Sequence, residues 1–333
     1  MRFFLTATML LTFLLSTLLL SNTFAGSTYN NTSQKPFTIR KLNLREEGLD
    51  IKGELPEMYN LDKLGVILTD QIKETYRQKV AAAKESKARS ILFEWEFYTS
   101  GNVSSLLLKT TITTAVSKEE VNSFNFAPDG SRIISVNDVI GPNGLQIANK
   151  VISQRIRANS EFYYASFPGL QSTDAFYVSD GEIVFLFDAF KIAPGSAGVI
   201  PFPLEIDSVI NSRLVKKDEG YWVNKSNYGL KMVSLRAVCR DLRYTVDWNR
   251  TTKKTTVERV GDITVTLKTD DNIYESSRPN APNKIQSRSL ESAPTIVDGV
   301  TYVPISFFDQ ILELVAYHVD DNGNIIFSTY IEN

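Results

Sequence analysis

The sequence predicts an α+β fold in which antiparallel sheets pack with helices in two domains, and three patterns indicate it. Residues 61–83 carry apolar side chains three or four positions apart, the period of an amphipathic helix. Residues 91–97 and 106–116 alternate apolar and polar side chains, which is typical of half-buried strands. Two similar helix-then-strand segments recur about seventy residues apart near the C-terminus, which indicates a duplicated unit.

The first domain is expected to begin at Phe37, after a polar tether over residues 26–36 that is rich in Ser, Thr and Asn. Its two alternating segments are expected to pair around Gly101-Asn102. A further turn between strands is expected at 125–131, where a proline and a glycine suit a tight bend. The remaining expected elements, up to residue 206, are a helix over 145–156 and strands over 175–178 and 182–187.

The N-terminus has the three parts of a secretory signal: Arg2, an apolar run from Phe3 to Leu20 and a short segment that ends in Ala25. We expect cleavage after Ala25, so that residues 1–25 form a signal peptide. The alternative is an uncleaved membrane anchor, because the apolar run is nearly long enough to cross a bilayer. Either interpretation places the protein in the extracellular space or the cell envelope, with membrane contact only through such an anchor.

The composition limits the chemistry that the chain can perform. Its 333 residues are 43% hydrophobic, so it can bury a sizeable core. Its 36 basic and 38 acidic side chains leave no large positive field for a phosphate backbone, so nucleic acid is not an expected partner. His318 is the only histidine, which excludes metal sites built from several histidines, and no cofactor is expected. Cys239 is the only cysteine, so no intramolecular disulfide can form, and we expect a buried thiol.

The duplicated unit is expected over residues 229–333, after a linker at 207–228 that includes a strand near Tyr221. The residues that carry a family resemblance are Ser234-Leu235-Arg236, Val246-Asp247-Trp248-Asn249, Thr252 to Val257 and Asp298 to Pro304. With these residues the region resembles the N-terminal-like domain of copper amine oxidases. That module is common on secreted proteins of Gram-positive bacteria, so the resemblance implies an exported protein.

This region departs from the family pattern at three places. Ser234 stands where a proline is usual. Arg243 and Leu314 replace a glycine that often follows the helix, and residues 280–289 form an additional polar insert. Within the second copy, Asn322-Gly323 lies between alternating residues and predicts a hairpin turn rather than a calcium loop.

A second family resemblance covers the first domain, from Phe37 to Ile206. It rests on Asn125-Phe126, Asp129-Gly130, Ile133, Asn137 to Ile140, Phe176 to Val178, Gly181, Ile183 to Phe185, Phe187, Ile192-Ala193-Pro194 and Gly198. These residues are similar to the extracellular domain of lysozyme-sensing anti-sigma factors, which some peptidoglycan deacetylases share. In the closing motif of that family an acid precedes Ile-Ala-Pro and Tyr-Ala-Ala-Gly follows it, whereas here Lys191 precedes it and Gly195 to Gly198 follow.

Two segments of the first domain are candidate ligand-binding surfaces. The first carries four aromatic residues beside a Pro-Gly pair: Phe162, Tyr163, Tyr164 and Phe167. Aromatic rings give large contact area to a sugar or a protein partner, and packing into the core is the alternative. The second is the loop with Lys191, Pro194 and Gly195, whose proline and glycine a tight loop alone would also explain.

These observations favour an exported, non-catalytic binding protein of the bacterial cell envelope. The expected ligand is an envelope protein of the lysozyme type or the cell-wall glycan, peptidoglycan. A cell-wall-active enzyme that uses carboxylates is an alternative, because paired acids of glycosidase type have no diagnostic spacing. An architectural stalk that assembles through strand edges is a further alternative.

Overall fold

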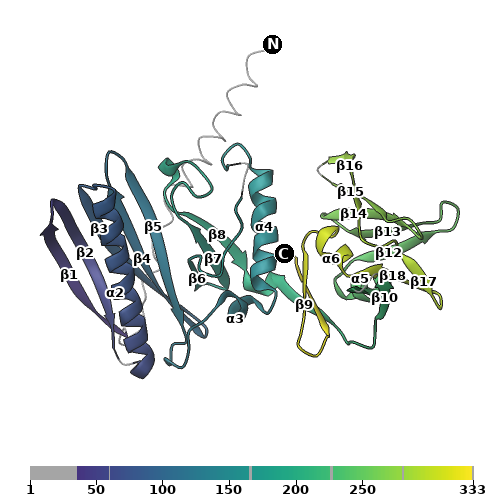
Figure 1. Cartoon of the computed structure of the whole chain (residues 1–333), viewed down its shortest axis with the longest axis horizontal. Helices are drawn as coiled ribbons and strands as arrows, with labels where there is room; N and C mark the ends of the chain where they lie inside the picture. Colours follow the sequence, from purple (N-terminus) through teal and green to yellow (C-terminus); the bar gives the residue numbers. More distant parts are fainter. Residues whose placement is uncertain (1–35, 60, 165–166, 226–227, 280, 332–333) are drawn as a thin grey trace, which may run out of the picture. The chain divides into compact units, whose positions relative to one another are not determined.

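The computed structural model describes residues 36–331 apart from residues 60, 165–166, 226–227 and 280. The predicted signal peptide, its cleavage site and most of the tether therefore lie outside the described residues. Residues Phe37–Asn333 form one compact unit, and its helices and mainly antiparallel sheets confirm the predicted α+β class (Figure 1). Among the described residues, no helix combines the length and apolar character that a membrane span requires.

The first sheet has five strands in the order β1-β2-β3-β4-β5. Its elements are β1 (Phe37–Glu46), β2 (Leu49–Met58), α2 (Asp62–Glu85), β3 (Ser90–Ser100), β4 (Val103–Thr113) and β5 (Ser117–Phe126). Neighbouring strands are antiparallel except β2 and β3, which are parallel because α2 connects them as a crossover. The predicted pairing around Gly101-Asn102 is confirmed, since Ser100 lies opposite Val103.

The predicted long helix is α2, and it lies across one face of this sheet (Figure 1). Its buried residues include Leu64, Leu68 and Ile72, which repeat at the expected spacing and pack in one core with Ile51 and Phe93 of the strands. Strand β4 departs from simple alternation because its other face is covered too. The neighbours of Leu107 there include Val184 and Leu186 of a second sheet.

That second sheet has the order β6-β7-β8. The elements of this region are α3 (Val136–Ile140), α4 (Gly144–Ala158), β6 (Phe176–Ser179), β7 (Glu182–Phe187), the short 3-10 helix η1 (Gly195–Ala197) and β8 (Ile200–Glu205). Helix α4 confirms the second predicted helix, and its apolar face packs against these strands. The predicted turn at 125–131 leads into a single bridge at Ile133 and then α3 rather than into a strand. A capping box between Ser135 and Asp138 starts that helix, which explains the difference.

The C-terminal part contains three further sheets, in the orders β19-β20-β9, β10-β11-β18-β17 and β12-β13-β14-β15-β16. Its elements are η2 (Ile206–Ser208), β9 (Val209–Val215), β10 (Tyr221–Lys225), β11 (Tyr228–Ser234), α5 (Leu235–Asp241), β12 (Thr245–Asn249), β13 (Lys254–Arg259), β14 (Ile263–Lys268), β15 (Ile273–Arg278), β16 (Ala281–Ser289), β17 (Thr295–Val297), β18 (Val300–Pro304), α6 (Ser306–Gln310), β19 (Val315–Val319) and β20 (Ile325–Tyr330). The polar insert forms β16, an exposed edge strand. The predicted hairpin turn at Asn322-Gly323 joins β19 and β20 and is confirmed.

Each copy of the duplicated unit is a helix followed by a strand, as predicted: α5 with β12, and α6 with β19. Two residues after α5 and three residues after α6 the backbone has a positive φ, 60° at Arg243 and 55° at Glu313. In the second copy, the sequence comparison took Leu314 as the residue that replaces the family's glycine. This was wrong by one residue, because Glu313 has the positive φ. Leu242 and Leu312 are fully buried, and in both copies the chain turns directly after this leucine.

The segment expected to link the domains contains two strands. β9 pairs with β20, which lies at the other end of the C-terminal part. Ala316 of β19 and Tyr330 of β20 belong to the same apolar core as α4 and β6-β7-β8. Asn143 strengthens this connection, because its side-chain Nδ2 donates to Ser328 Oγ at 2.7 Å and its Oδ1 lies 2.9 Å from His318 Nδ1. The domain boundaries taken from the sequence are still a prediction.

Candidate functional site

The four aromatic residues predicted as a binding segment divide into two exposed and two packed rings. Phe162 is 50% exposed and Tyr164 is 41% exposed. Tyr163 and Phe167 are partly buried in the core, where their rings lie 5.5 Å from Phe202 and 5.7 Å from Phe187 respectively. Packing of the inner pair holds the segment in place, and the outer pair is available to a ligand.

The second candidate loop follows β7 and is tied to the first sheet. Asp188 Oδ1 accepts a hydrogen bond from the Val121 backbone at 2.8 Å, and burial raises the pKa of this carboxyl. Lys191 Nζ lies 2.5 Å from Asp174 Oδ1 and 5.6 Å from the centre of the Phe187 ring. The ammonium group of Lys191 is therefore already neutralised by a carboxylate, and its first role is to fix the loop.

Phe190 is a large apolar side chain of this loop that the fold leaves exposed. Its backbone is left-handed, with a φ of 70°, and its side chain is 51% exposed. A side chain at Gly195 would collide with it, because a Cβ there would lie 2.0 Å from the Phe190 ring. Glycine at 195 therefore makes room for the ring, and Pro194 beside it is exposed.

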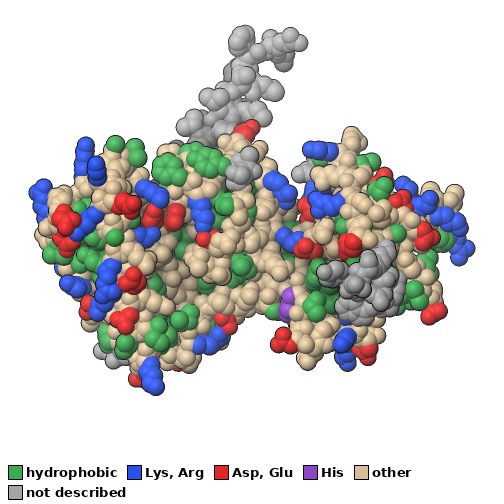
Figure 2. All heavy atoms as spheres, viewed as in Figure 1, with side chains coloured by type: hydrophobic (Ala, Val, Ile, Leu, Met, Phe, Trp, Pro, Cys, Tyr) green, Lys and Arg blue, Asp and Glu red, His purple; other side chains and the backbone are tan. Residues whose placement is uncertain are grey.

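A backbone hydrogen bond brings the two candidate segments together: Tyr164 N donates to Ile192 O at 2.8 Å. The exposed rings of Phe162, Tyr164 and Phe190 consequently belong to two adjoining segments. We call these three residues the aromatic surface. On the face drawn in Figure 2, Lys and Arg side chains are interspersed with Asp and Glu and form no field of one sign. The aromatic surface is therefore defined by its exposed rings and not by charge.

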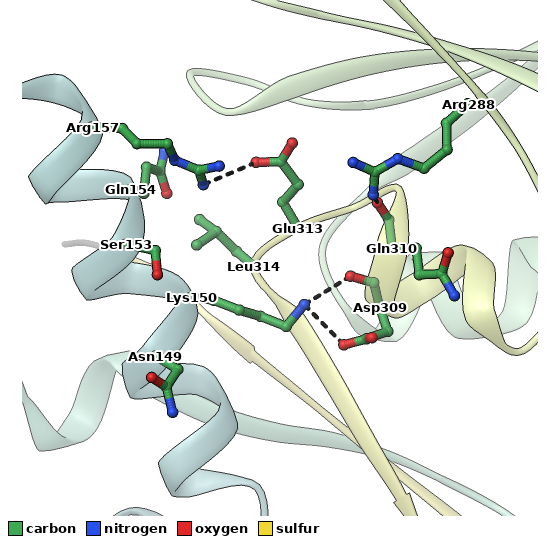
Figure 3. Close-up of a pocket in the computed structure, with 10 residues that line it drawn as sticks. All are labelled: Asn149, Lys150, Ser153, Gln154, Arg157, Arg288, Asp309, Gln310, Glu313 and Leu314. Atoms are coloured by element: carbon green, nitrogen blue, oxygen red, sulfur yellow. Dashed lines mark hydrogen bonds and ion pairs between the residues drawn. The ribbon is translucent and has the colours of Figure 1, made fainter. Parts of the chain in front are cut away.

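A separate hollow lies between α4 on one side and, on the other, the end of α6 with the residues that follow it (Figure 3). We call it the polar cleft. The chamber that contains Arg157 and Arg288, here called the main chamber, has a volume of about 290 Å³. An adjoining chamber of about 470 Å³ shares Asn149, Lys150 and Asp309 with it. The residues around the main chamber are Asn149, Lys150, Ser153, Gln154, Arg157, Arg288, Asp309, Gln310, Glu313 and Leu314.

Ion pairs connect the two walls of the polar cleft. Lys150 Nζ lies 2.8 Å from Asp309 Oδ1 and donates to the Asp309 carbonyl at 2.7 Å. Arg157 lies 3.8 Å from the Glu313 carboxylate, which Arg278 also binds from the other side. Figure 3 shows Lys150 and Arg157 pointing from α4 toward Asp309 and Glu313 on the facing segment.

Neither the histidine nor the cysteine belongs to a catalytic arrangement among the residues described. His318 lies partly exposed in β19 and contacts the Asn143 amide. Cys239 is fully buried in α5, also as predicted, and burial raises the pKa of its thiol. In the described part of the chain, no group of three or more His, Cys, Asp or Glu side chains has the proximity that holding a metal ion requires.

The thiol of Cys239 is expected to resist modification in the folded protein, because the thiolate that reacts is disfavoured in a buried apolar site. A thiol-specific chromogenic reagent should report no reactive thiol in the native protein at pH 8. The same reagent should report one thiol per chain in denaturant. Rapid reaction of the native protein would show that α5 opens or that its core is accessible.

Comparison with known proteins gives matches for both parts of the chain. Residues 223–327 match the family described as the copper amine oxidase N-terminal domain, which confirms the C-terminal resemblance. Residues 137–207 match a family described as a protein of unknown function, DUF3298, within the region of the second resemblance. No curated protein matched the chain.

Two solved structures of DUF3298 family proteins are similar to the chain. One is from Pseudomonas aeruginosa PAO1, with 14% identity and a TM-score of 0.36, and the match covers 52% of this chain and 91% of that one. The other is from Bacteroides fragilis NCTC 9343, with 11% identity and a TM-score of 0.35, and the match covers 51% of this chain and 91% of that one.

Sequence reasoning missed two features of these sites. Phe190 directly precedes Lys191 in the closing motif, but nothing in the sequence indicated that its ring would be exposed. The polar cleft was missed entirely, because its two walls lie about 150 residues apart in the chain. Lys150 and Arg157 are seven positions apart on α4, and this spacing on one helix face was the only available signal.

Proposed function

We propose that this protein is an exported, non-catalytic binding protein of the bacterial cell envelope, and that it recognises a protein ligand of the lysozyme type. One observation carries the proposal: Phe162, Tyr164 and Phe190 are each about half exposed on two segments that a backbone hydrogen bond joins. The choice of ligand is supported by the sequence motifs of this domain, which resemble those of lysozyme-sensing extracellular domains. The apolar N-terminal run supports export.

The physical basis is the burial of rings that the folded protein leaves in contact with water. Large aromatic side chains dominate the binding energy of many protein interfaces, because they bury much area at a small cost in side-chain entropy. Here the inner rings of Tyr163 and Phe167 are packed, so the backbone that presents Phe162 and Tyr164 is held in advance of binding. Lys191 and Asp174 fix the loop that presents Phe190 in the same way.

The aromatic surface is testable by removing its rings. The double variant Phe162→Ser/Tyr164→Ser is expected to bind lysozyme at least about tenfold more weakly than the parent protein, since removing an interface ring typically costs more than 1 kcal/mol. Calorimetric titration of the purified protein with lysozyme measures this. Trp248→Ser is the matched control, because Trp248 is a comparably exposed ring, 47%, on β12.

Three results would contradict the proposal. The first is the absence of any heat of binding between the parent protein and lysozyme at accessible concentrations, and the second is binding by the double variant that is as tight as that of the parent. Equal loss of affinity in Trp248→Ser would also contradict it, because the effect would then follow from any lost surface ring.

A further inference from the structure

The polar cleft differs in chemistry from the aromatic surface and shares no residue with it. We propose that the polar cleft binds an acidic saccharide, with the anionic group of the sugar between Arg157 and Arg288 and its hydroxyl groups along α4. This inference does not depend on the proposed protein ligand. It rests on the shape, the free hydrogen-bonding groups, the charge and the backbone conformation of the cleft.

The dimensions of the polar cleft suit an extended ligand. Its chambers of about 290 Å³ and about 470 Å³ share three lining residues and therefore adjoin each other. Small-molecule sites commonly have volumes of roughly 300–1,000 Å³. The second chamber adds Gln146 and the partly buried ring of Tyr317, so one end of the depression offers an aromatic face and the other offers guanidinium groups.

The neutral residues of the cleft are available for hydrogen bonds. The side chains of Ser153, Gln154 and Gln310 form no hydrogen bond with any residue that the structure describes, and all three line the main chamber. The side chain of Asn149 is different, because it is already bonded to the Leu170 backbone. One hydroxyl and two amides therefore remain to pair with sugar hydroxyl groups, which both donate and accept.

The charge of the cleft favours an anion. Three cationic side chains line it, Lys150, Arg157 and Arg288, against the two carboxylates of Asp309 and Glu313. In the part of the chain that the structure describes, Arg288 has no carboxylate partner and donates one hydrogen bond, 2.6 Å long, to the Gln310 carbonyl. A guanidinium has five N–H donors in a planar fork that matches a carboxylate, so Arg288 retains most of its donors for a ligand.

The carboxylate of Glu313 sets the position of Arg157 across the cleft. Arg278 binds the same carboxylate and also lies 3.4 Å from Asp262, so Glu313 is fixed from inside the C-terminal part. The backbone of Glu313 is left-handed, a conformation that is strained in residues with a Cβ. Non-glycine residues in such conformations cluster at ligand sites. We therefore attribute the presence of a glutamate at this left-handed position to the ion pairs that its side chain forms with Arg157 and Arg278.

The test uses three saccharides that differ in charge: a trigalacturonate, a muramic-acid-containing disaccharide and neutral chitotriose. The purified protein is titrated with each by calorimetry at low ionic strength. At least one acidic saccharide is expected to bind about tenfold or more tightly than chitotriose, and its affinity should fall as salt is added. Tighter binding of the muramic-acid-containing disaccharide would indicate a cell-wall ligand, whereas tighter binding of the trigalacturonate would indicate a polyuronate. Equal affinity for the neutral and acidic saccharides, or no binding of any, would overturn the proposal.

Variants locate the binding in the cleft. Arg157→Gln and Arg288→Gln are each expected to weaken binding of the acidic saccharide about tenfold or more, because each removes a charge-assisted hydrogen bond. Arg45→Gln is the matched control, because Arg45 is an exposed arginine on β1 in the first sheet. Unchanged affinity in both cleft variants would overturn the proposal.

Lysozyme binding of the same variants separates this inference from the proposed function. Arg157→Gln and Arg288→Gln should bind lysozyme as the parent does. Phe162→Ser/Tyr164→Ser should bind the acidic saccharide as the parent does. Loss of saccharide binding in the aromatic double variant would assign the sugar to the aromatic surface and would overturn the assignment to the cleft.

Discussion

Replacing Phe187 by alanine is expected to lower the free energy of unfolding by about 3–5 kcal/mol. The side chain is fully buried at the end of β7, and its ring lies 5.7 Å from both Phe167 and Phe202. Alanine would leave a cavity beneath both candidate segments, because Phe167 of one segment packs against the Phe187 ring and Lys191 of the other lies over it. Chemical denaturation of the purified variant, followed by circular dichroism, measures the loss.

Phe190→Ala, three residues further on, provides the contrast. Its ring is 51% exposed, so its removal is expected to change the free energy of unfolding by no more than about 0.5 kcal/mol. The same variant is expected to weaken lysozyme binding. A large loss of stability in Phe190→Ala would mean that this ring serves the fold, and Phe190 would then have to be removed from the aromatic surface.

The second large effect is expected at Gly53, in β2. Gly53→Ala is expected to destabilise the protein by about 3 kcal/mol or more, since two penalties add. The backbone φ is 113°, which residues with a Cβ rarely adopt, and a Cβ there would lie 1.9 Å from the Phe93 carbonyl oxygen of β3. Because the obstacle is backbone, β2 and β3 would have to separate where they pair. Thermal unfolding of the purified variant measures the effect.

Gly48→Ala isolates the penalty that comes from the left-handed backbone alone. Gly48 also has a positive φ, 85°, but no atom lies within 4 Å of the position that its Cβ would take. Its substitution is expected to cost only the backbone strain, roughly 1–2 kcal/mol. Equal destabilisation by the two substitutions would show that the close approach of β2 and β3 contributes nothing.

Local periodicity was sufficient to predict the two long helices, α2 and α4, and the hairpin of β3 and β4. The stripe from Leu64 to Ala83 predicted α2, because one helix face packs on one sheet. The alternation before and after Gly101 predicted β3 and β4, because their register follows from a two-residue turn. In the second copy of the repeat, the glycine-replacing residue was assigned to Leu314, whereas Glu313 has the left-handed backbone. Spacing alone does not show at which residue the chain changes direction.

Pairings between distant segments were not predictable from the same patterns. The parallel pairing of β2 with β3 depends on the crossover through α2, and the pairing of β9 with β20 joins segments more than a hundred residues apart. Neither pairing leaves a periodic signal in the sequence. The burial of Leu107 has the same origin, because a second sheet covers a face of β4 that alternation alone would assign to solvent.

The candidate site was predicted in part. Sequence identified the segment with Phe162 and Tyr164 but did not determine which of its four rings would be packed, because the choice depends on Phe187 and Phe202 of another sheet. It identified Lys191 as a ligand contact, whereas the structure pairs this side chain with Asp174. The polar cleft required the fold, since Arg157 and Arg288 belong to different parts of the chain.

The most direct test of the binding account is hydrogen exchange of the purified protein with and without lysozyme. We expect added protection of backbone amides in two segments, residues 159–164 and 188–197, which carry the rings of Phe162, Tyr164 and Phe190. Protection confined to other elements, or exchange that lysozyme leaves unchanged throughout the chain, would contradict the account.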